Sequence, residues 1–156
     1  MKAVRGFTLI EMLVVLAILG TLAAAAHPLL ELQVQRRKES ELREALRNIR
    51  SAIDAYRAAV LQGQLAVLPG GRGYPPDLRA LVDGVPDLRA ADGGKLYFLR
   101  RIPRDPFADP RLPAEQTWVL RSSDSPPDNP RAGADVMDVI STSRGVALDG
   151  SLHAHW

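Results

Sequence analysis

The feature that most constrains this chain is an apolar stretch near its start, residues 7–26, which contains a single charged side chain, Glu11. A helix of about 20 residues, at 1.5 Å per residue, spans roughly 30 Å, the thickness of the hydrocarbon core of a bilayer. Lys2 and Arg5 precede the stretch, and no acidic residue does. The pattern therefore predicts a membrane-associated helix that begins close to Phe7.

Three interpretations of this stretch are open. It can be a conventional signal peptide cut after Ala26, because small residues fill positions 24–26 and a basic segment precedes the apolar run. It can be a simple anchor in which Glu11 lies at the helix start, where the helix dipole favours an acid. It can also be a helix retained for polymerisation, in which Glu11 has a function, because an ionisable group in a membrane segment costs about 2.5–3.5 kcal/mol.

Residues 6–11 favour the third interpretation. They read Gly-Phe-Thr-Leu-Ile-Glu and resemble the cleavage and methylation motif of type IV prepilins and of the pseudopilins of type II secretion. The resemblance implies that a prepilin peptidase cuts between Gly6 and Phe7 and removes residues 1–6 as a leader. It also implies that the same enzyme N-methylates Phe7 and that the apolar helix is retained.

The spacing of Phe7 and Glu11 suits a charge pair. Cleavage would convert the amide nitrogen of Phe7 into an amine with a pKa of about 7.7–8.0, which is largely cationic at neutral pH. Glu11 follows four residues later, about 6 Å along the helix axis. Its carboxylate can then pair with the Phe7 amine of a neighbouring copy, which would set the register of a polymer, or with that of its own chain. The spacing alone leaves both arrangements open.

The helical pattern extends well beyond the apolar stretch. Pro28 removes a backbone hydrogen bond and is expected to bend or locally open the helix, and the resemblance implies the same for the part that starts at Gly20. Residues 29–62 continue as an amphipathic helix. The sequence predicts one helix over residues 7–62, of which residues 7–28 are the transmembrane and polymerisation segment. Its buried stripe is expected to comprise Leu42, Leu46, Ile49, Ile53, Tyr56 and Val60.

Residues 63–156 are expected to form a small domain that covers this stripe, and the resemblance implies that this domain is periplasmic. Turn-rich segments alternate there with short apolar runs, which is typical of antiparallel strands joined by loops. The predicted fold is α+β and pilin-like, a long N-terminal helix whose back half packs on a small antiparallel sheet. The predicted elements are a short helix at 77–82, strands or extended segments at 96–99, 117–121 and 135–141, and a hairpin over 146–154.

The second part of the chain narrows the resemblance to the major, G-type pseudopilins. Those proteins have a proline, an acid, a proline and an aromatic residue in succession between helix and sheet, and a tryptophan near the C-terminus. The similar residues here are Pro103, Asp105, Pro106, Phe107 and Trp156. The resemblance implies a structural subunit that is single-pass in the inner membrane with a cytoplasmic N-terminus. It would assemble into a periplasmic pseudopilus that helps export folded proteins across the outer membrane.

The same resemblance implies the partners. They are further copies of the chain in a homopolymer, minor pseudopilins, the prepilin peptidase, an inner-membrane platform protein, an assembly ATPase and the lipid bilayer. The nearest alternative is a minor type IV pilin or a competence pilin, and a cut after Ala26 would instead give a secreted soluble binding protein. Nucleic acid is not expected as a partner. Without Lys2 and Arg5 the 20 basic residues fall to 18 and equal the 18 acidic ones, so no general attraction to a polyanion remains.

Candidate metal ligands are sparse. G-type pseudopilins hold a calcium ion in a C-terminal loop with paired aspartates, whereas the matching residues 143–151 here provide Asp149 alone. Calcium takes about 6–8 oxygen ligands, several of them from carboxylates. The sequence therefore predicts no cofactor, and Asp135, Asp138 and Asp149 are the candidates if calcium does bind.

The remaining polar residues form no catalytic constellation. His153 and His155 would share one face of a strand, either as half of a zinc site or, as we expect, as a solvent-facing pair. Asp105 and Asp109 stand in a proline-rich setting that suits turns better than acid–base chemistry. The chain has no cysteine, which excludes disulfides and thiolate metal ligands. The sequence thus predicts a structural protein and not an enzyme.

Overall fold

The structure is a computed structural model that describes residues 7–67 and 72–156, with residues 24–29 described by their backbone alone. The predicted leader 1–6, which includes Gly6, lies outside the described residues. The chain divides into two compact units, Met1–Arg37 and Lys38–Trp156.

Helix α1, Leu9–Leu61, contributes to both units. Its bounds confirm the predicted helix over residues 7–62. The helix continues through Gly20 and Pro28, and the side chain of Pro28 is not among those described. A kink in this part of the helix therefore stays a prediction, as does a membrane boundary at residue 28.

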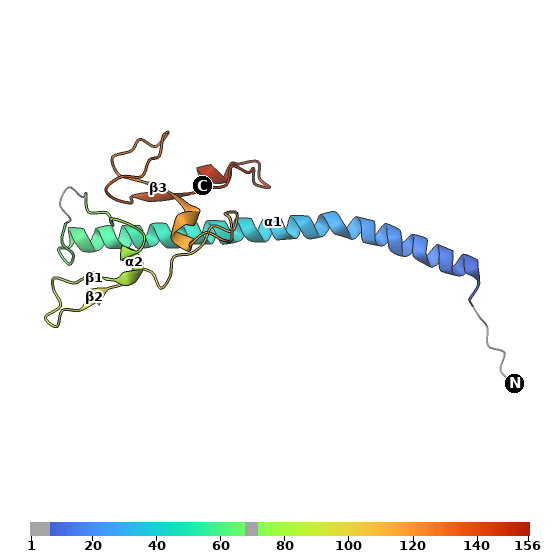
Figure 1. Cartoon of the computed structure of the whole chain (residues 1–156), viewed down its shortest axis with the longest axis horizontal. Helices are drawn as coiled ribbons and strands as arrows, with labels where there is room; N and C mark the ends of the chain where they lie inside the picture. The colour runs from blue at the N-terminus through green and yellow to red at the C-terminus, as the bar shows by residue number, and fades with distance from the viewer. Residues whose placement is uncertain (1–6, 68–71) are drawn as a thin grey trace. The chain divides into compact units, whose positions relative to one another are not determined.

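The buried face of α1 in the second unit is the stripe that the sequence predicts. All six residues of that stripe have 8 % or less of their surface exposed. The core against them includes Leu81, Trp118, Val136 and Val139. Figure 1 shows the short helix α2 and the strands β1, β2 and β3 gathered along this part of α1. Burial of this apolar surface is the main driving force for folding of the second unit.

The strands pair as two separate antiparallel ribbons. The shorter elements are α2, Ala80–Asp83; β1, Val85–Pro86; β2, Lys95–Leu96; the 3₁₀ turn η1, Ala114–Thr117; β3, Trp118–Arg121; and β4, Asp138–Ser141. β1 pairs with β2, and β3 pairs with β4 so that Trp118 lies opposite Ser141. The predicted α+β architecture is confirmed, although the described residues form two small sheets where the sequence indicated one.

Two predicted elements between α1 and β3 are shorter than expected. Helix α2 begins at Ala80, three residues after the predicted start, and the carboxylate of Asp77 accepts the amide hydrogen of Ala80 at 2.8 Å. The strand predicted over residues 96–99 contributes only Leu96 to a ladder. The amides of Phe98 and Leu99 do not join the ladder, because both donate to the carbonyl of Leu81 at 2.9 Å.

The strand predicted over residues 135–141 also starts later, at Asp138. The amide of Val136 donates to the carbonyl of Pro75 at 2.8 Å, so this part of the backbone is bonded to a loop and not to a strand.

The predicted C-terminal hairpin is present in reduced form. Val146 pairs with Leu152 as an isolated antiparallel bridge, and the amide of Ala147 donates to the carbonyl of Ser151 at 2.8 Å. The second strand ends there, because His153–His155 form a 3₁₀ turn, η2.

Candidate functional site

Thr8 and Glu11 form a hydrogen-bonded box at the start of α1. The amide and the hydroxyl group of Thr8 both donate to Oε2 of Glu11 at 2.8 Å, and the amide of Glu11 donates to Oγ1 of Thr8 at 3.3 Å. This arrangement is a capping box, in which each side chain satisfies a backbone donor of the other residue. Sequence reasoning missed Thr8, although Thr-x-x-Glu at a helix start is the pattern that reveals such a box.

The box assigns an intrachain role to Glu11. Both of its residues follow the predicted cleavage between Gly6 and Phe7, so removal of a leader leaves the box intact. Phe7 lies just before the helix with 81 % of its surface exposed. A cap and a charge pair are compatible, because a carboxylate has about four lone-pair sites.

The first unit exposes a series of large apolar side chains along α1. From Met12 to Leu16 five consecutive large apolar residues are each at least 43 % exposed, so no side of this part of the helix is polar. Monomeric soluble proteins rarely expose contiguous apolar patches larger than a few hundred Å². The series therefore requires a neighbour, either lipid or protein. It comprises Phe7, Leu9, Ile10, Met12, Leu13, Val14, Val15, Leu16, Ile18, Leu19, Leu22, Leu30, Leu32 and Val34.

Within the described residues, no helix combines the length and the apolarity that a bilayer crossing requires. Residues 24–29, at the end of the predicted span 7–28, contribute no described side chains. The span is therefore not confirmed and stays a prediction.

Comparison with known protein families decides the nature of the N-terminus. A model described as the prokaryotic N-terminal methylation motif matches residues 1–26. The chain carries a pilin-type methylation motif. Such motifs are typical of type IV pilin-like proteins and pseudopilins, which are generally structural and are processed by a prepilin peptidase. Neither a search of curated proteins nor a search of solved structures finds a match to the chain.

Outside the methylation motif, the structure does not bring the three calcium candidates into one group. Each carboxylate accepts hydrogen bonds from other side chains. The donors are Ser122 and Ser123 for Asp135, Arg50 for Asp138, and Arg43 and Ser151 for Asp149. In the part of the chain that the structure describes, no set of three or more His, Cys, Asp or Glu could hold a metal ion.

The two C-terminal histidines occupy different environments. His155 is exposed, whereas His153 has 2 % of its surface exposed. The ring of His153 stacks on Phe107, with centroids 4.3 Å apart, and meets Trp156 edge-on at 5.0 Å. Our expectation of a solvent-facing pair is wrong for His153, because the chain turns into η2 after Leu152 and directs this imidazole into an aromatic cluster.

Asp105 and Asp109 serve in turns, as the sequence predicts. Asp105 is buried, and its Oδ1 accepts the amide hydrogen of Phe107 at 2.8 Å, while its Oδ2 accepts the hydroxyl of Ser141 at 2.6 Å. Asp109 accepts the amide hydrogen of Arg111 at 2.9 Å. Each carboxylate thus accepts the amide hydrogen of the residue two positions later, as an aspartate in a turn does.

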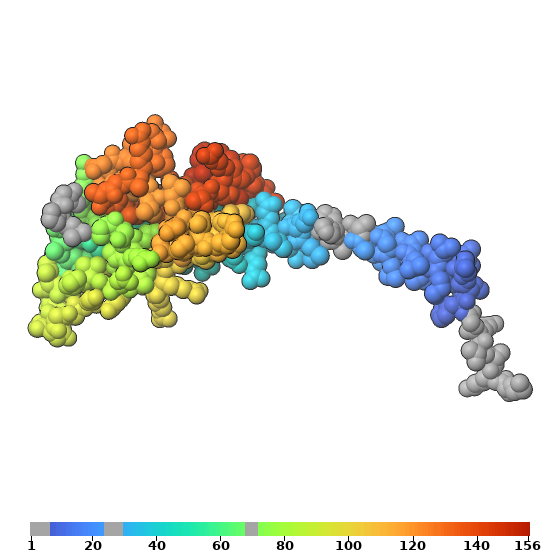
Figure 2. Space-filling view, in the orientation of Figure 1, coloured from blue at the N-terminus to red at the C-terminus, as the bar shows by residue number. Residues whose placement is uncertain are grey.

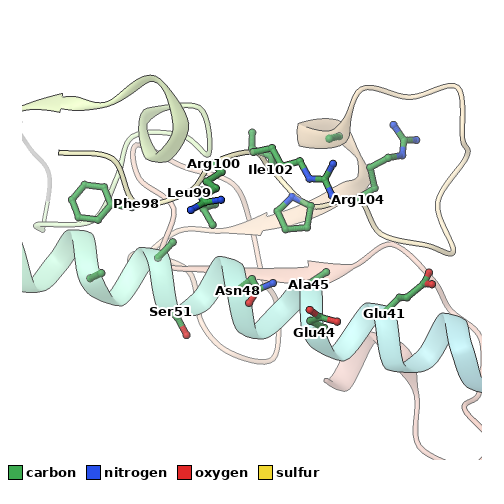
Figure 3. Close-up of a pocket in the computed structure, with 15 residues that line it drawn as sticks. Glu41, Glu44, Ala45, Asn48, Ser51, Phe98, Leu99, Arg100, Ile102 and Arg104 are labelled. Atoms are coloured by element: carbon green, nitrogen blue, oxygen red, sulfur yellow. The ribbon is translucent and has the colours of Figure 1, made fainter. Parts of the chain in front are cut away.

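A groove of about 890 Å³ lies between α1 and the segment 98–104 (Figure 3). Its α1 wall carries Glu41 and Glu44 among small residues, and the opposite wall carries three arginines, at 100, 101 and 104. Arg104 donates from its guanidinium to the carbonyl of Asp109 at 3.0 Å. Asn48 and Ser51 also line the α1 wall, so charged and polar side chains face the groove from both sides.

Proposed function

We propose that the chain is a structural subunit of a type II secretion pseudopilus. In this proposal the leader 1–6 is removed, Phe7 is methylated, and the N-terminal helix holds the subunit in the inner membrane with its N-terminus in the cytoplasm. Residues 63–156 then lie in the periplasm. Polymerisation through the helix gives a fibre that helps export folded proteins across the outer membrane.

The observation that carries the proposal is the combination of a methylation motif with an uncovered apolar helix. The motif match covers residues 1–26, and the exposed apolar series runs from Phe7 to Val34. A helix that is apolar all round is stable in lipid or among other helices, and not in water. Transfer from bilayer to helix bundle keeps this surface away from water throughout assembly.

Processing gives the helix start a charge that it lacks before cleavage. The freed Phe7 amine is cationic, and Glu11 is the single acidic residue in the first turn of α1. In a filament the carboxylate can keep its bonds to Thr8 and also neutralise the amine of an adjacent copy. Unpaired charges in a low-dielectric environment are costly, so this pairing favours one register.

The assignment to type II secretion is supported by the role of the proline-rich loop. The carbonyl of Pro103 accepts the indole N–H of Trp118 at 2.9 Å, Asp105 is bonded to Ser141, and Phe107 stacks on His153. The loop that resembles the G-type pseudopilins is therefore an integral part of the core. As a pseudopilus subunit, the chain would have minor pseudopilins, the prepilin peptidase, an inner-membrane platform protein and an assembly ATPase as partners.

A gene deletion tests the proposal against the alternatives. We expect a deletion strain to retain folded export substrates in its periplasm, and the wild-type chain to restore their release. A Gly6→Val variant, altered at the predicted cleavage site, is expected not to restore it. Unchanged export together with loss of DNA uptake or of pilus-based motility would contradict the proposal and identify a competence pilin or a type IV pilin. Unchanged export with a soluble product that starts at His27 would identify a secreted binding protein.

A further inference from the structure

The resemblance to G-type pseudopilins raises the question of a calcium ion in the C-terminal loop. Within residues 143–151 Asp149 is the single carboxylate, and calcium takes about 6–8 oxygen ligands. Asp149 already accepts hydrogen bonds from the guanidinium of Arg43 and from the amide of Ser151, both at 2.9 Å. A cation at this carboxylate would lie beside a fixed positive charge, which opposes its binding.

The other candidate carboxylates fit calcium no better. Asp138 accepts a hydrogen bond from Nε of Arg50 at 2.7 Å, so it too is paired with a guanidinium. Both oxygens of Asp135 accept hydrogen bonds from Ser123, through its amide at 2.8 Å and its hydroxyl at 2.6 Å. The residues present therefore do not fit a calcium ion.

Three polar residues of α1 hold the C-terminal segment instead. Oε1 of Glu39, which is 4 % exposed, accepts the amide hydrogen of Leu148 at 2.9 Å. Arg43 binds Asp149, and its guanidinium carbon lies 3.9 Å from the ring centroid of Trp156. Arg50 donates to the backbone carbonyl of Trp156. We call Glu39, Arg43 and Arg50 the clasp.

The clasp residues share one face of the helix. At 100° per residue, positions four and eleven after Glu39 return to within about 40° of it. The clasp therefore contacts the C-terminal segment at both ends, Leu148 in the hairpin and Trp156 after η2. Figure 2 shows this segment, in red, at the surface of the second unit.

We propose that the clasp replaces a calcium ion, and that this chain fixes its C-terminal segment on α1 without any metal. The carboxylate of Glu39 satisfies a loop amide, and the two arginines supply the positive charge that a cation would otherwise provide. Folding of the second unit is then independent of calcium. This inference concerns the second unit alone and does not rest on which filament the chain joins.

The direct test is thermal unfolding of the full chain in mild detergent, followed by tryptophan fluorescence. Trp156 and Trp118 both lie in the second unit, so the signal reports on its folding. We expect the same Tm in excess EDTA and in excess CaCl₂. A Tm that falls in EDTA and returns with CaCl₂ would overturn the proposal.

Hydrogen exchange of residues 146–152 adds a measurement that follows the hairpin itself. We expect wild-type exchange to be the same with EDTA and with CaCl₂, and Arg43→Ala to exchange roughly 3- to 10-fold faster there, since it loses a part-exposed ion pair and a cation–π contact. Arg47→Ala is the matched control, because Arg47 is exposed on the same helix and is expected to leave exchange unchanged. Equal exchange in both variants would contradict the clasp.

Charge reversal separates the ion pair from general damage to the helix. Arg43→Asp is expected to accelerate exchange more than Arg43→Ala, and adding Asp149→Arg is expected to restore part of the protection. If the double variant exchanges as fast as Arg43→Asp alone, the pair does not hold the hairpin and the proposal fails.

Discussion

The imidazole of His153 stacks on the ring of Phe107, with centroids 4.3 Å apart and an angle of 28° between the planes. The two residues come from the proline-rich loop and from the last turn of the chain. Nδ1 of His153 lies 3.0 Å from the hydroxyl oxygen of Ser143. The stacking on Phe107 and the contact with Ser143 together make the C-terminus part of the core of the second unit.

Replacement of His153 by alanine should therefore destabilise the second unit. We expect a loss of about 2–4 kcal/mol, as for other large buried side chains, and a lower Tm in thermal unfolding. The matched control is His155→Ala, two residues later and exposed, which we expect to change stability by less than about 0.5 kcal/mol. Equal losses in the two variants would show that the stacking contributes nothing specific.

Gly84→Ala should destabilise the folded chain more than Gly93→Ala does. Both glycines have positive φ, +79° and +73°, so an alanine is strained at either position. At Gly84 a Cβ would also lie 2.5 Å from Cε1 of Tyr97, whereas the space at Gly93 is open. We expect the free energy of unfolding to fall by about 1 kcal/mol in Gly93→Ala and by about 1–3 kcal/mol in Gly84→Ala.

Removal of the ring isolates the contact at Gly84. In a Tyr97→Ala background, Gly84→Ala is expected to cost no more than Gly93→Ala does, as measured by the shift in Tm. If the cost of Gly84→Ala is unchanged without the ring, the conflict with Tyr97 is not the cause.

Stability should fall in acid because folding favours the ionised form of certain aspartates. Burial raises the pKa of Asp135, but hydrogen bonds from Ser123 and Ser122 outweigh it, and the net pKa is lowered from 3.8. Hydrogen bonds from Ser151, together with the charge of Arg43, lower the pKa of Asp149. A lowered folded-state pKa adds stability that is complete above the unfolded pKa and is lost as the pH falls through the folded value.

We therefore expect a nearly constant contribution from these groups above about pH 5 and a decline below about pH 4. Asp135→Asn should flatten the decline of Tm with falling pH. Asp128→Asn, at an exposed position, serves as the control and should leave the decline unchanged. The opposite result, a steeper decline in Asp135→Asn, would contradict the role of this carboxylate.

Variants at the helix start separate capping from charge pairing. Glu11→Gln keeps an acceptor for Thr8 and so preserves the capping box, but it removes the charge. Thr8→Ala removes the cap and keeps the charge, at a cost of about 0.5–2 kcal/mol in helix stability. If the charge directs assembly, Glu11→Gln should incorporate poorly into sheared filaments, and Thr8→Ala should incorporate nearly normally.

Glu11→Ala completes the series, since it loses both features. It is expected to remain in the membrane fraction and to assemble no better than Glu11→Gln. Normal assembly of Glu11→Gln with poor assembly of Thr8→Ala would show that Glu11 acts as a cap and not as a partner for an amine.

The parts of the fold that follow from local sequence could be predicted. The front of the long helix follows from an apolar stretch long enough to span a bilayer, and its back half follows from a 3.6-residue periodicity, which also predicts the buried residues from Leu42 to Val60. The N-terminal motif is a contiguous run of residues. β3 lies in the run Thr-Trp-Val-Leu-Arg at residues 117–121, which is rich in β-branched and aromatic residues, so its position was also predictable.

The parts of the fold that depend on contacts between residues distant in the sequence could not be predicted. Arg43 and Asp149 are 106 residues apart in sequence, and no local pattern links them or predicts that His153 becomes buried. β1 was missed for another reason, since it has two residues and one of them is Pro86, which argues against a strand. Thr8 is different: its capping pattern was visible in the sequence.

The central claim is that cleavage at Phe7 converts an inert precursor into a polymerising subunit. Mass spectrometry of the N-terminal peptide, from the chain purified out of the membrane and filament fractions, tests it most directly. We predict an amino terminus at Phe7 that carries one N-methyl group. A mature chain that begins at His27, or one in which Gly6 and Phe7 are still joined, would contradict the claim.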